Sequence, residues 1–119
     1  MPEAALAMKN ENWIEVCKLG DLPANAGVAA RVGGRQVALF YLPAETPAVY
    51  AIDNWDPIGE AAVLSRGIVG DLGGALVVAS PLYKQHFRLA DGQCLEDPAV
   101  QVPAYPVRVD GDRVWVAVP

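Results

Sequence analysis

Residues 107–118 read VRVDGDRVWVAV, and this stretch indicates the fold more clearly than any other part of the chain. Two valine-rich runs flank a turn that contains Asp110-Gly111. Asp-Gly between two β-branched runs is a strong signature of a tight antiparallel hairpin, because such turns often need a positive φ. A β-hairpin is therefore predicted at residues 107–118.

Further strands are predicted upstream, in short apolar runs separated by turn residues. Gly33-Gly34 is a predicted tight turn between two such runs, and Gly73-Gly74 is a predicted turn ahead of the run Ala75–Ala79. Strands this short, with turns this frequent, are typical of an all-β sandwich or small barrel of antiparallel strands. Ala61–Arg66 is the one segment that favours a helical turn, and residues 53–73 read as a long irregular stretch in which a functional site is expected. The predicted strands are Trp13–Cys17, Gly27–Val32, Arg35–Leu42, Val49–Ile52, Ala75–Ala79, Gln85–Leu89, Val107–Val109 and Arg113–Val118.

The composition predicts one globular domain. The 119 residues suffice for a single core, with a tail over residues 1–12 and a folded domain over residues 13–118. The net charge is −5 and the nine Lys and Arg residues are scattered singly, which argues against binding to nucleic acid. No run approaches the roughly 18 apolar residues of a membrane span, and no signal peptide is recognised. Cys17 and Cys94 form no C-x-x-C pair, so a cytoplasmic protein is expected.

Familiar catalytic and metal-binding motifs are missing from the sequence. His86 is the single histidine, and without a G-x-S-x-G elbow it is predicted to be a partly exposed strand residue. Asp53, Asp56 and Glu60 lack the spacing of a calcium-binding loop, so we interpret them as solvated carboxylates. We therefore expect no catalytic, cofactor-binding or metal-binding residue in this chain.

Two loops, read together, carry the functional signal. Residues 54–59 (NWDPIG) follow one predicted strand, and residues 80–92 (SPLYKQHFRLADG) follow another. They resemble the cluster-binding loops of Rieske iron–sulfur domains, C-x-H and C-P-x-H-G-x-x-F-x-x-x-x-G, in which two Cys and two His hold the irons. Pro81, Phe87 and the Asp91-Gly92 turn match this pattern.

Other residues occupy every ligand position of the Rieske pattern. Asn54 and Ser80 stand at the two cysteine positions, while Asp56 and Tyr83 stand at the two histidine positions. Lys84 replaces the glycine that follows the second histidine. The resemblance thus implies a Rieske-like domain without an iron–sulfur cluster, since one histidine cannot supply two imidazole ligands.

Longer segments of the chain resemble one particular group of Rieske-like domains. Residues 52–57 (IDNWDP), 63–71 (VLSRGIVGD) and 78–89 (VASPLYKQHFRL) are similar to the small subunit of assimilatory NAD(P)H-dependent nitrite reductase. The resemblance covers about Trp13 to Val118. It implies a non-catalytic subunit for nitrate assimilation, whose partner is the nitrite reductase large subunit. Flavin, iron–sulfur centres and sirohaem are expected in that partner, which reduces nitrite to ammonium, and no cofactor is expected in this chain.

The residues at the former ligand positions have a structural interpretation. Without iron the two loops must still pack together, and side-chain hydrogen bonds can replace metal bonds. Aromatic residues are enriched at interface centres, so residues of the same loops are also predicted to face the large subunit. The former ligand positions are Asn54, Asp56, Ser80 and Tyr83, and the predicted partner interface is Trp55, Tyr83, Lys84 and His86.

Two other functions stay open on the sequence. An electron-transfer ferredoxin would share the fold, but the missing ligands count against it. A Rieske-like adaptor that binds another protein or a small ligand, without redox chemistry, would show no preference for the nitrite reductase large subunit.

Overall fold

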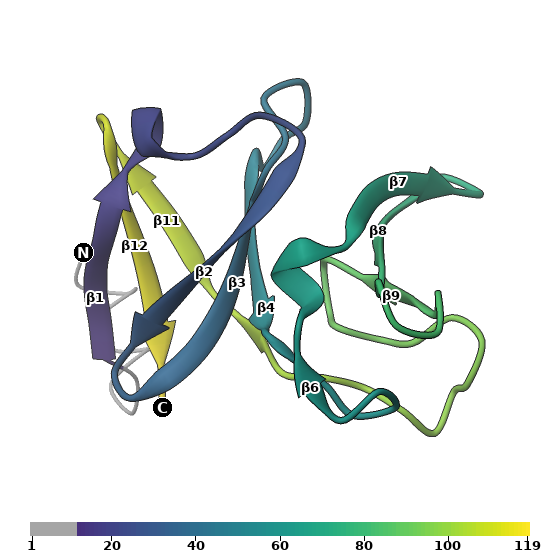
Figure 1. Ribbon diagram of the computed structural model, residues 1–119. Coiled ribbons are helices and arrows are strands. Elements are labelled where there is room, and N and C mark those ends of the chain that lie inside the picture. Colours follow the sequence, from purple (N-terminus) through teal and green to yellow (C-terminus); the bar gives the residue numbers. More distant parts are fainter. Residues whose placement is uncertain (1–11) are drawn as a thin grey trace.

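Two units of antiparallel sheet lie side by side in the computed structural model, which describes residues 12–119 (Figure 1). Of the predicted tail, residues 1–11 lie outside the described residues, and Asn12 begins the first strand. The strands are β1 Asn12–Lys18, β2 Ala26–Val32, β3 Arg35–Tyr41, β4 Val49–Asp53, β5 Trp55–Asp56, β6 Ala61–Ala62, β7 Ile68–Leu72, β8 Ala75–Ala79, β9 His86–Arg88, β10 Ala104–Tyr105, β11 Val107–Asp110 and β12 Arg113–Val118. Two short 3₁₀ turns, η1 Leu19–Asp21 and η2 Leu64–Arg66, complete the elements.

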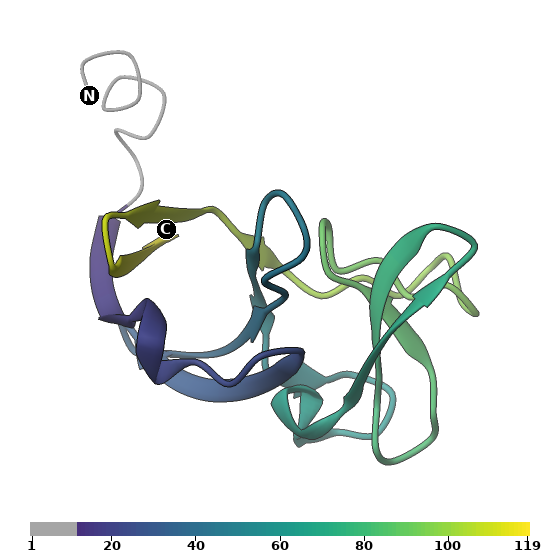
Figure 2. The ribbon, with the colours of Figure 1, turned by 90° about the horizontal axis from the view of Figure 1, so that it is seen from above.

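The first unit contains two sheets that face each other. One has the order β1-β12-β11 and the other β10-β4-β3-β2. Seen from above, these strands curve around a shared interior (Figure 2). Alternate residues of β12, Val114, Val116 and Val118, point into this interior and are buried against Val37 and Leu39 of β3. The sheets are antiparallel and are not hydrogen-bonded into a closed barrel, so the sandwich is the better of the two predicted descriptions.

The second unit is smaller and carries the two loops of interest. Its main sheet has the order β7-β8-β9, and β5 pairs with β6 in a short ribbon beneath it. Phe87 of β9 and Val78 of β8 are fully buried in its core, together with Leu64 of η2. Phe40 and Ile52 of the first unit belong to the same cluster. Because the two units share this apolar cluster, the position of the loops is fixed relative to the larger sheets.

The eight predicted strands are all present, each within one residue at either end. Gly33-Gly34 joins β2 to β3, Gly73-Gly74 joins β7 to β8, and Gly111 lies in the turn between β11 and β12. All five glycines have positive φ. Glycine adopts this conformation without strain, which is why these turns could be predicted from the sequence.

The prediction of an irregular stretch over residues 53–73 was wrong. This segment contains β5, β6, η2 and β7, and only the last three residues of the predicted helical turn Ala61–Arg66 form η2. Gly70 and Asp71 interrupt the apolar pattern of β7, which is held in place by pairing with β8 from Ile68↔Ala79 to Leu72↔Ala75. Sheet pairing of this kind depends on the neighbouring strand more than on the strand's own composition.

Two further predictions concern the cysteines and the membrane. Cys17 and Cys94 are both free thiols in the structure. Burial, with a smaller contribution from Asp21, raises the pKa of the Cys17 thiol. Within residues 12–119, no helix is both long enough and apolar enough to span a membrane.

Gly92 holds the turn that the sequence placed after β9. Its φ is 77°, and its amide donates to the Arg88 carbonyl at 2.7 Å while its carbonyl accepts from the Val102 amide at 2.9 Å. A Cβ atom at this position would lie 2.0 Å from the Val102 carbonyl oxygen. A side chain is therefore excluded both by backbone conformation and by space.

Gly92→Ala is predicted to destabilise the fold by about 3 kcal/mol or more, because strain at positive φ adds to a backbone clash. Gly111→Ala is the matched control, since its φ of 63° is similar and nothing lies within 4 Å of a Cβ there. It should cost only about 1 kcal/mol. Urea unfolding of both variants measures the difference, and equal losses would contradict the steric explanation.

Candidate functional site

The two loops of the second unit meet through one buried side-chain hydrogen bond. Asp56 lies on β5, just after the end of β4, and Ser80 directly follows β8. The Ser80 hydroxyl donates to Asp56 Oδ2 at 2.5 Å, and both residues are 0% exposed. A hydrogen bond to a carboxylate is short and roughly twice as strong as a neutral one. This contact therefore fastens two segments that are 24 residues apart.

The second oxygen of Asp56 organises its own loop. Oδ1 accepts from the Ile58 amide at 2.9 Å and from the Gly59 amide at 3.0 Å. This Asx turn is a common way for an Asp to shape a loop ahead of a tight bend. Asp56 was predicted to be a solvated carboxylate, and that prediction was wrong. A carboxylate can be buried here because backbone amides and a hydroxyl supply its hydrogen bonds.

Asn54 fastens the same loop from its other side. Its Oδ1 accepts from the Ser65 amide at 2.8 Å, and its Nδ2 donates to the Ala62 carbonyl at 3.3 Å. Neighbouring Asp53 accepts from the Tyr105 hydroxyl at 3.0 Å. Burial, reinforced by the hydrogen bond to Asp53, raises the pKa of Tyr105. The start of the first loop is thus anchored to η2 and to β10.

Tyr83 does not join the buried set. It is 64% exposed, whereas Asn54, Asp56 and Ser80 are buried. Ser80 Oγ accepts from the Leu82 amide at 3.3 Å, which turns the following residues outward. The structure therefore brings three of the four former ligand positions to the base of the loops and leaves the fourth on the surface. Leu82 is also exposed, and it was not included in the predicted interface. Its position between Pro81 and Tyr83 in the second loop was the signal that could have identified it.

His86 lies on β9 and is partly exposed, as predicted. Its Nδ1 lies 2.5 Å from Glu96 Oε2, and its backbone amide donates to Glu96 Oε1 at 2.8 Å. Burial alone would raise the pKa of Glu96, but the two contacts from His86 outweigh burial and hold it below its usual range. Because the Ser80 hydroxyl donates to Asp56, Ser80 and His86 do not form the nucleophile–base pair of a hydrolase.

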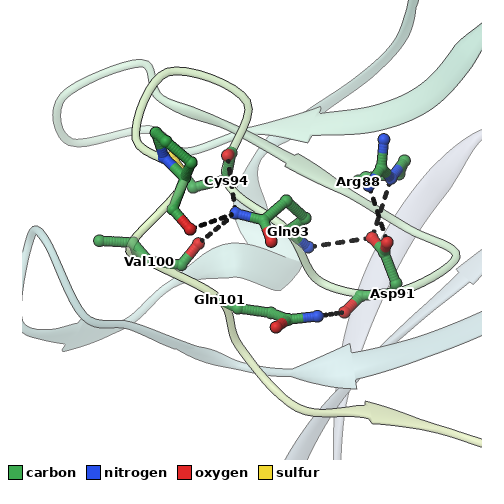
Figure 3. A network of polar contacts seen from close by, with 7 residues as sticks. Arg88, Asp91, Gln93, Cys94, Val100 and Gln101 are labelled. Carbon is green, nitrogen blue, oxygen red and sulfur yellow. Dashed lines mark hydrogen bonds and ion pairs between the residues drawn. The ribbon is translucent and has the colours of Figure 1, made fainter.

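A polar network holds the segment that follows β9 (Figure 3). Arg88 Nε and Nη2 donate to the two oxygens of Asp91 at 2.9 and 2.8 Å. Gln93 Nε2 donates to the Val100 carbonyl at 2.9 Å, and Gln101 Nε2 donates to the Asp91 carbonyl at 2.9 Å. The Arg88 guanidinium holds the pKa of Asp91 below its usual range. These contacts tie the segment around the Gly92 turn to residues 100 and 101.

Comparison with known proteins places this arrangement in a family. The model of the Rieske-like [2Fe-2S] domain matches residues 12–117. A nitrite reductase (NADH) small subunit from Salmonella typhimurium is 50% identical over 97 residues, which cover 82% of this chain and 89% of that protein. The chain belongs to the nitrite reductase small-subunit branch of the Rieske-like domain family.

One solved structure and one further sequence relative are also similar to this chain. The structure of the E. coli protein NirD superimposes with a TM-score of 0.82 at 42% identity, covering 91% of this chain and 97% of that one. The nitrite reductase [NAD(P)H] large subunit of Klebsiella oxytoca is 46% identical over 110 residues, or 92% of this chain. The chain spans only 11% of the length of that large subunit.

The residues of this Rieske-like domain do not fit the [2Fe–2S] cluster that the family name implies. Cluster irons are held by thiolates and imidazoles, whereas the four ligand positions offer an amide, a carboxylate, an aliphatic hydroxyl and a phenol. The Asp56–Ser80 hydrogen bond also joins the loops directly, where a cluster would have to separate them. Among residues 12–119 there is no group of three or more His, Cys, Asp and Glu arranged to hold a metal ion.

Ser80→Ala is predicted to lower the free energy of unfolding by about 2 kcal/mol, because it leaves a buried carboxylate oxygen without its donor. Tyr83→Phe is the matched control at a former ligand position, and its exposed hydroxyl predicts a change within about 0.5 kcal/mol. Urea unfolding monitored by circular dichroism gives both values. Equal effects would show that the Asp56–Ser80 bond contributes nothing specific.

The Arg88–Asp91 pair predicts an acid dependence. Since the folded pKa of Asp91 is lowered, its contribution to stability is fully present above its unfolded pKa of about 3.9 and is lost as pH falls through the folded pKa. Asp91→Asn should therefore unfold at a lower temperature than the wild type at pH 7, and the gap should close towards pH 3. Glu45→Gln, at an exposed loop carboxylate, is the control and should show no such convergence.

Proposed function

We propose that this chain is the non-redox small subunit of an assimilatory nitrite reductase, which binds the large subunit and supports its reduction of nitrite to ammonium with NAD(P)H. The observation that carries the proposal is the match to small subunits over nearly their whole length, combined with a loop pair closed by the Asp56–Ser80 hydrogen bond. The match supports assembly with a large subunit, and the closed loop pair supports a role without electron transfer.

The Klebsiella oxytoca relative supports the choice of partner. In that protein a segment equivalent to 92% of this chain is part of a polypeptide named as the large subunit. In Salmonella typhimurium the equivalent domain is a separate small subunit. A domain that occurs both within the large subunit and as a separate chain has the same neighbour in both arrangements. We therefore infer that this chain binds a large subunit non-covalently.

The work of this subunit lies in binding and not in electron transfer. Flavin, iron–sulfur and sirohaem groups supply the redox chemistry of such an enzyme, and the resemblance assigns them to the large subunit. The four former ligand positions of this chain offer neither a thiolate nor an imidazole, and polar contacts hold the two loops together. Its contribution is to stabilise or order the large subunit. We place the complex in the cytoplasm, where two free cysteines are stable.

Co-expression with a tagged sirohaem nitrite reductase large subunit from the same source tests the proposal. We expect the two chains to purify together in equal amounts, and the NAD(P)H-dependent nitrite reduction or thermal stability of the large subunit to fall when this chain is omitted. This chain alone should be colourless and free of iron. A ligand-bearing Rieske ferredoxin serves as the control and should neither bind nor restore activity. An indifferent large subunit, or an iron–sulfur signal in this chain, contradicts the proposal.

A further inference from the structure

Exposed apolar side chains are concentrated on the second unit. Within residues 12–119, six of the seven large apolar side chains that are exposed lie between positions 55 and 95. Three of them belong to the two joined loops: Trp55 is 47% exposed, Leu82 44% and Tyr83 64%. Together with the exposed Lys84 they form what we call the tip surface. The Asp56–Ser80 hydrogen bond brings the loop of Trp55 to the loop of Leu82 and Tyr83, and exposed apolar groups that gather in this way mark interaction sites more often than single ones do.

The tip surface is held rigid from below. Asp56 takes one bond from Ser80 and two from the backbone of its own loop, directly after Trp55. Leu82 packs over Gly59, where a Cβ atom would lie 2.4 Å from Leu82 Cδ1. A side chain at Gly59 would displace Leu82 from this position. Aromatic groups held on a rigid base lose little conformational entropy when they bind, which is the property of an interface anchor.

Lys84 supplies a second and independent observation. Its φ is 67°, in the left-handed region, because its amide closes the turn on the Ser80 carbonyl at 3.1 Å. Glycine is the residue that adopts this conformation without strain, and glycine stands here in the Rieske loop pattern. Lys84 also takes part in none of the ion pairs found within residues 12–119. Lys84 is thus a strained lysine whose charge has no carboxylate partner among residues 12–119.

We propose that the tip surface is the face that docks on the nitrite reductase large subunit, with Trp55 and Tyr83 in an apolar socket and the Lys84 ammonium against a carboxylate of the large subunit. The inference rests on the proposed function and specifies its interface. Exposed aromatic side chains on a hydrogen-bonded base, together with a lysine that forms no ion pair within residues 12–119, complement an apolar pocket with an acidic rim. The contact of Lys84 with the large subunit would then offset the free energy that its strained backbone costs the folded chain.

The outer side of β7 is the competing face. Ile68 is 74% exposed and Leu72 is also exposed, on either side of Gly70. These residues lie on a sheet edge and lack the hydrogen-bonded base that holds the tip loops. Their participation is the alternative that the experiment decides.

The test measures the affinity of purified variants for the tagged, cofactor-loaded large subunit, alongside the melting temperature of each variant alone. Trp55→Ala and Tyr83→Ala should each weaken binding about 30-fold or more, as expected for aromatic anchors. Val109→Ala, an exposed apolar residue on β11, is the matched control and should stay within about twofold of the wild type. Ile68→Ser probes the competing face and should behave like the control.

Lys84 gives the sharpest outcome, because stability and binding should move in opposite directions. Lys84→Gly should raise the melting temperature by about 3–6 °C through relief of the left-handed strain, yet weaken binding about tenfold. Lys84→Gln keeps the strain and removes only the charge, so it should weaken binding without raising the melting temperature.

The outcomes separate this inference from the proposed function. If the wild-type chain binds and the tip variants bind equally well, or if only Ile68→Ser is impaired, the docking face is wrong while the proposed function stands. If the wild-type chain does not bind the large subunit, both are overturned.

Discussion

The hydrogen bond from the Ser80 hydroxyl to the Asp56 carboxylate is the contact on which the second unit depends. Asp56 lies on β5, which follows β4 of the larger sheets, and Ser80 directly follows β8 of the smaller sheet, so the bond joins segments that are distant in the chain. Both groups are fully buried, which makes the bond strong and its loss costly. The two loops stand at the positions of the Rieske pattern, but a direct hydrogen bond joins them.

A hydrogen-bonded carboxylate and a metal cluster impose different requirements on the same scaffold. Irons accept ligands from both loops at once, whereas Asp56 must find donors for each of its oxygens. It takes one from the opposite loop and two from its own backbone. Asn54 no longer faces a shared centre and binds the backbone at residues 62 and 65. The fourth position is then released from any structural role, and Tyr83 lies on the surface.

In the rest of the second unit, too, polar contacts hold the backbone while apolar side chains are exposed. Polar contacts at its flank, Arg88 with Asp91 and His86 with Glu96, hold the segment from β9 to residue 101 together with the Gln101–Asp91 hydrogen bond. Apolar groups face outward at the loop ends, where no element of the described chain covers them. The polar contacts hold the loop backbone in place, and the loops expose their apolar side chains. This arrangement suits a subunit that acts by binding, because a rigid surface loses little entropy on association.

The sequence alone determined the elements whose partners are close along the chain. Glycine turns and apolar runs identified the hairpins β2–β3 and β11–β12 and the strand β8 after its Gly73-Gly74 turn, whereas β7 was missed; the loop spacing identified the Rieske-like family. Only the tertiary structure decided that Asp56 is buried while Tyr83 is exposed, and that His86 finds Glu96 ten residues away. It also decided that β5, β6 and β10 are strands, because two-residue segments take their conformation from the strand beside them. Local pattern encodes turns and strand faces, whereas the burial of a polar side chain depends on whether distant segments bring it donors, which a single sequence does not specify.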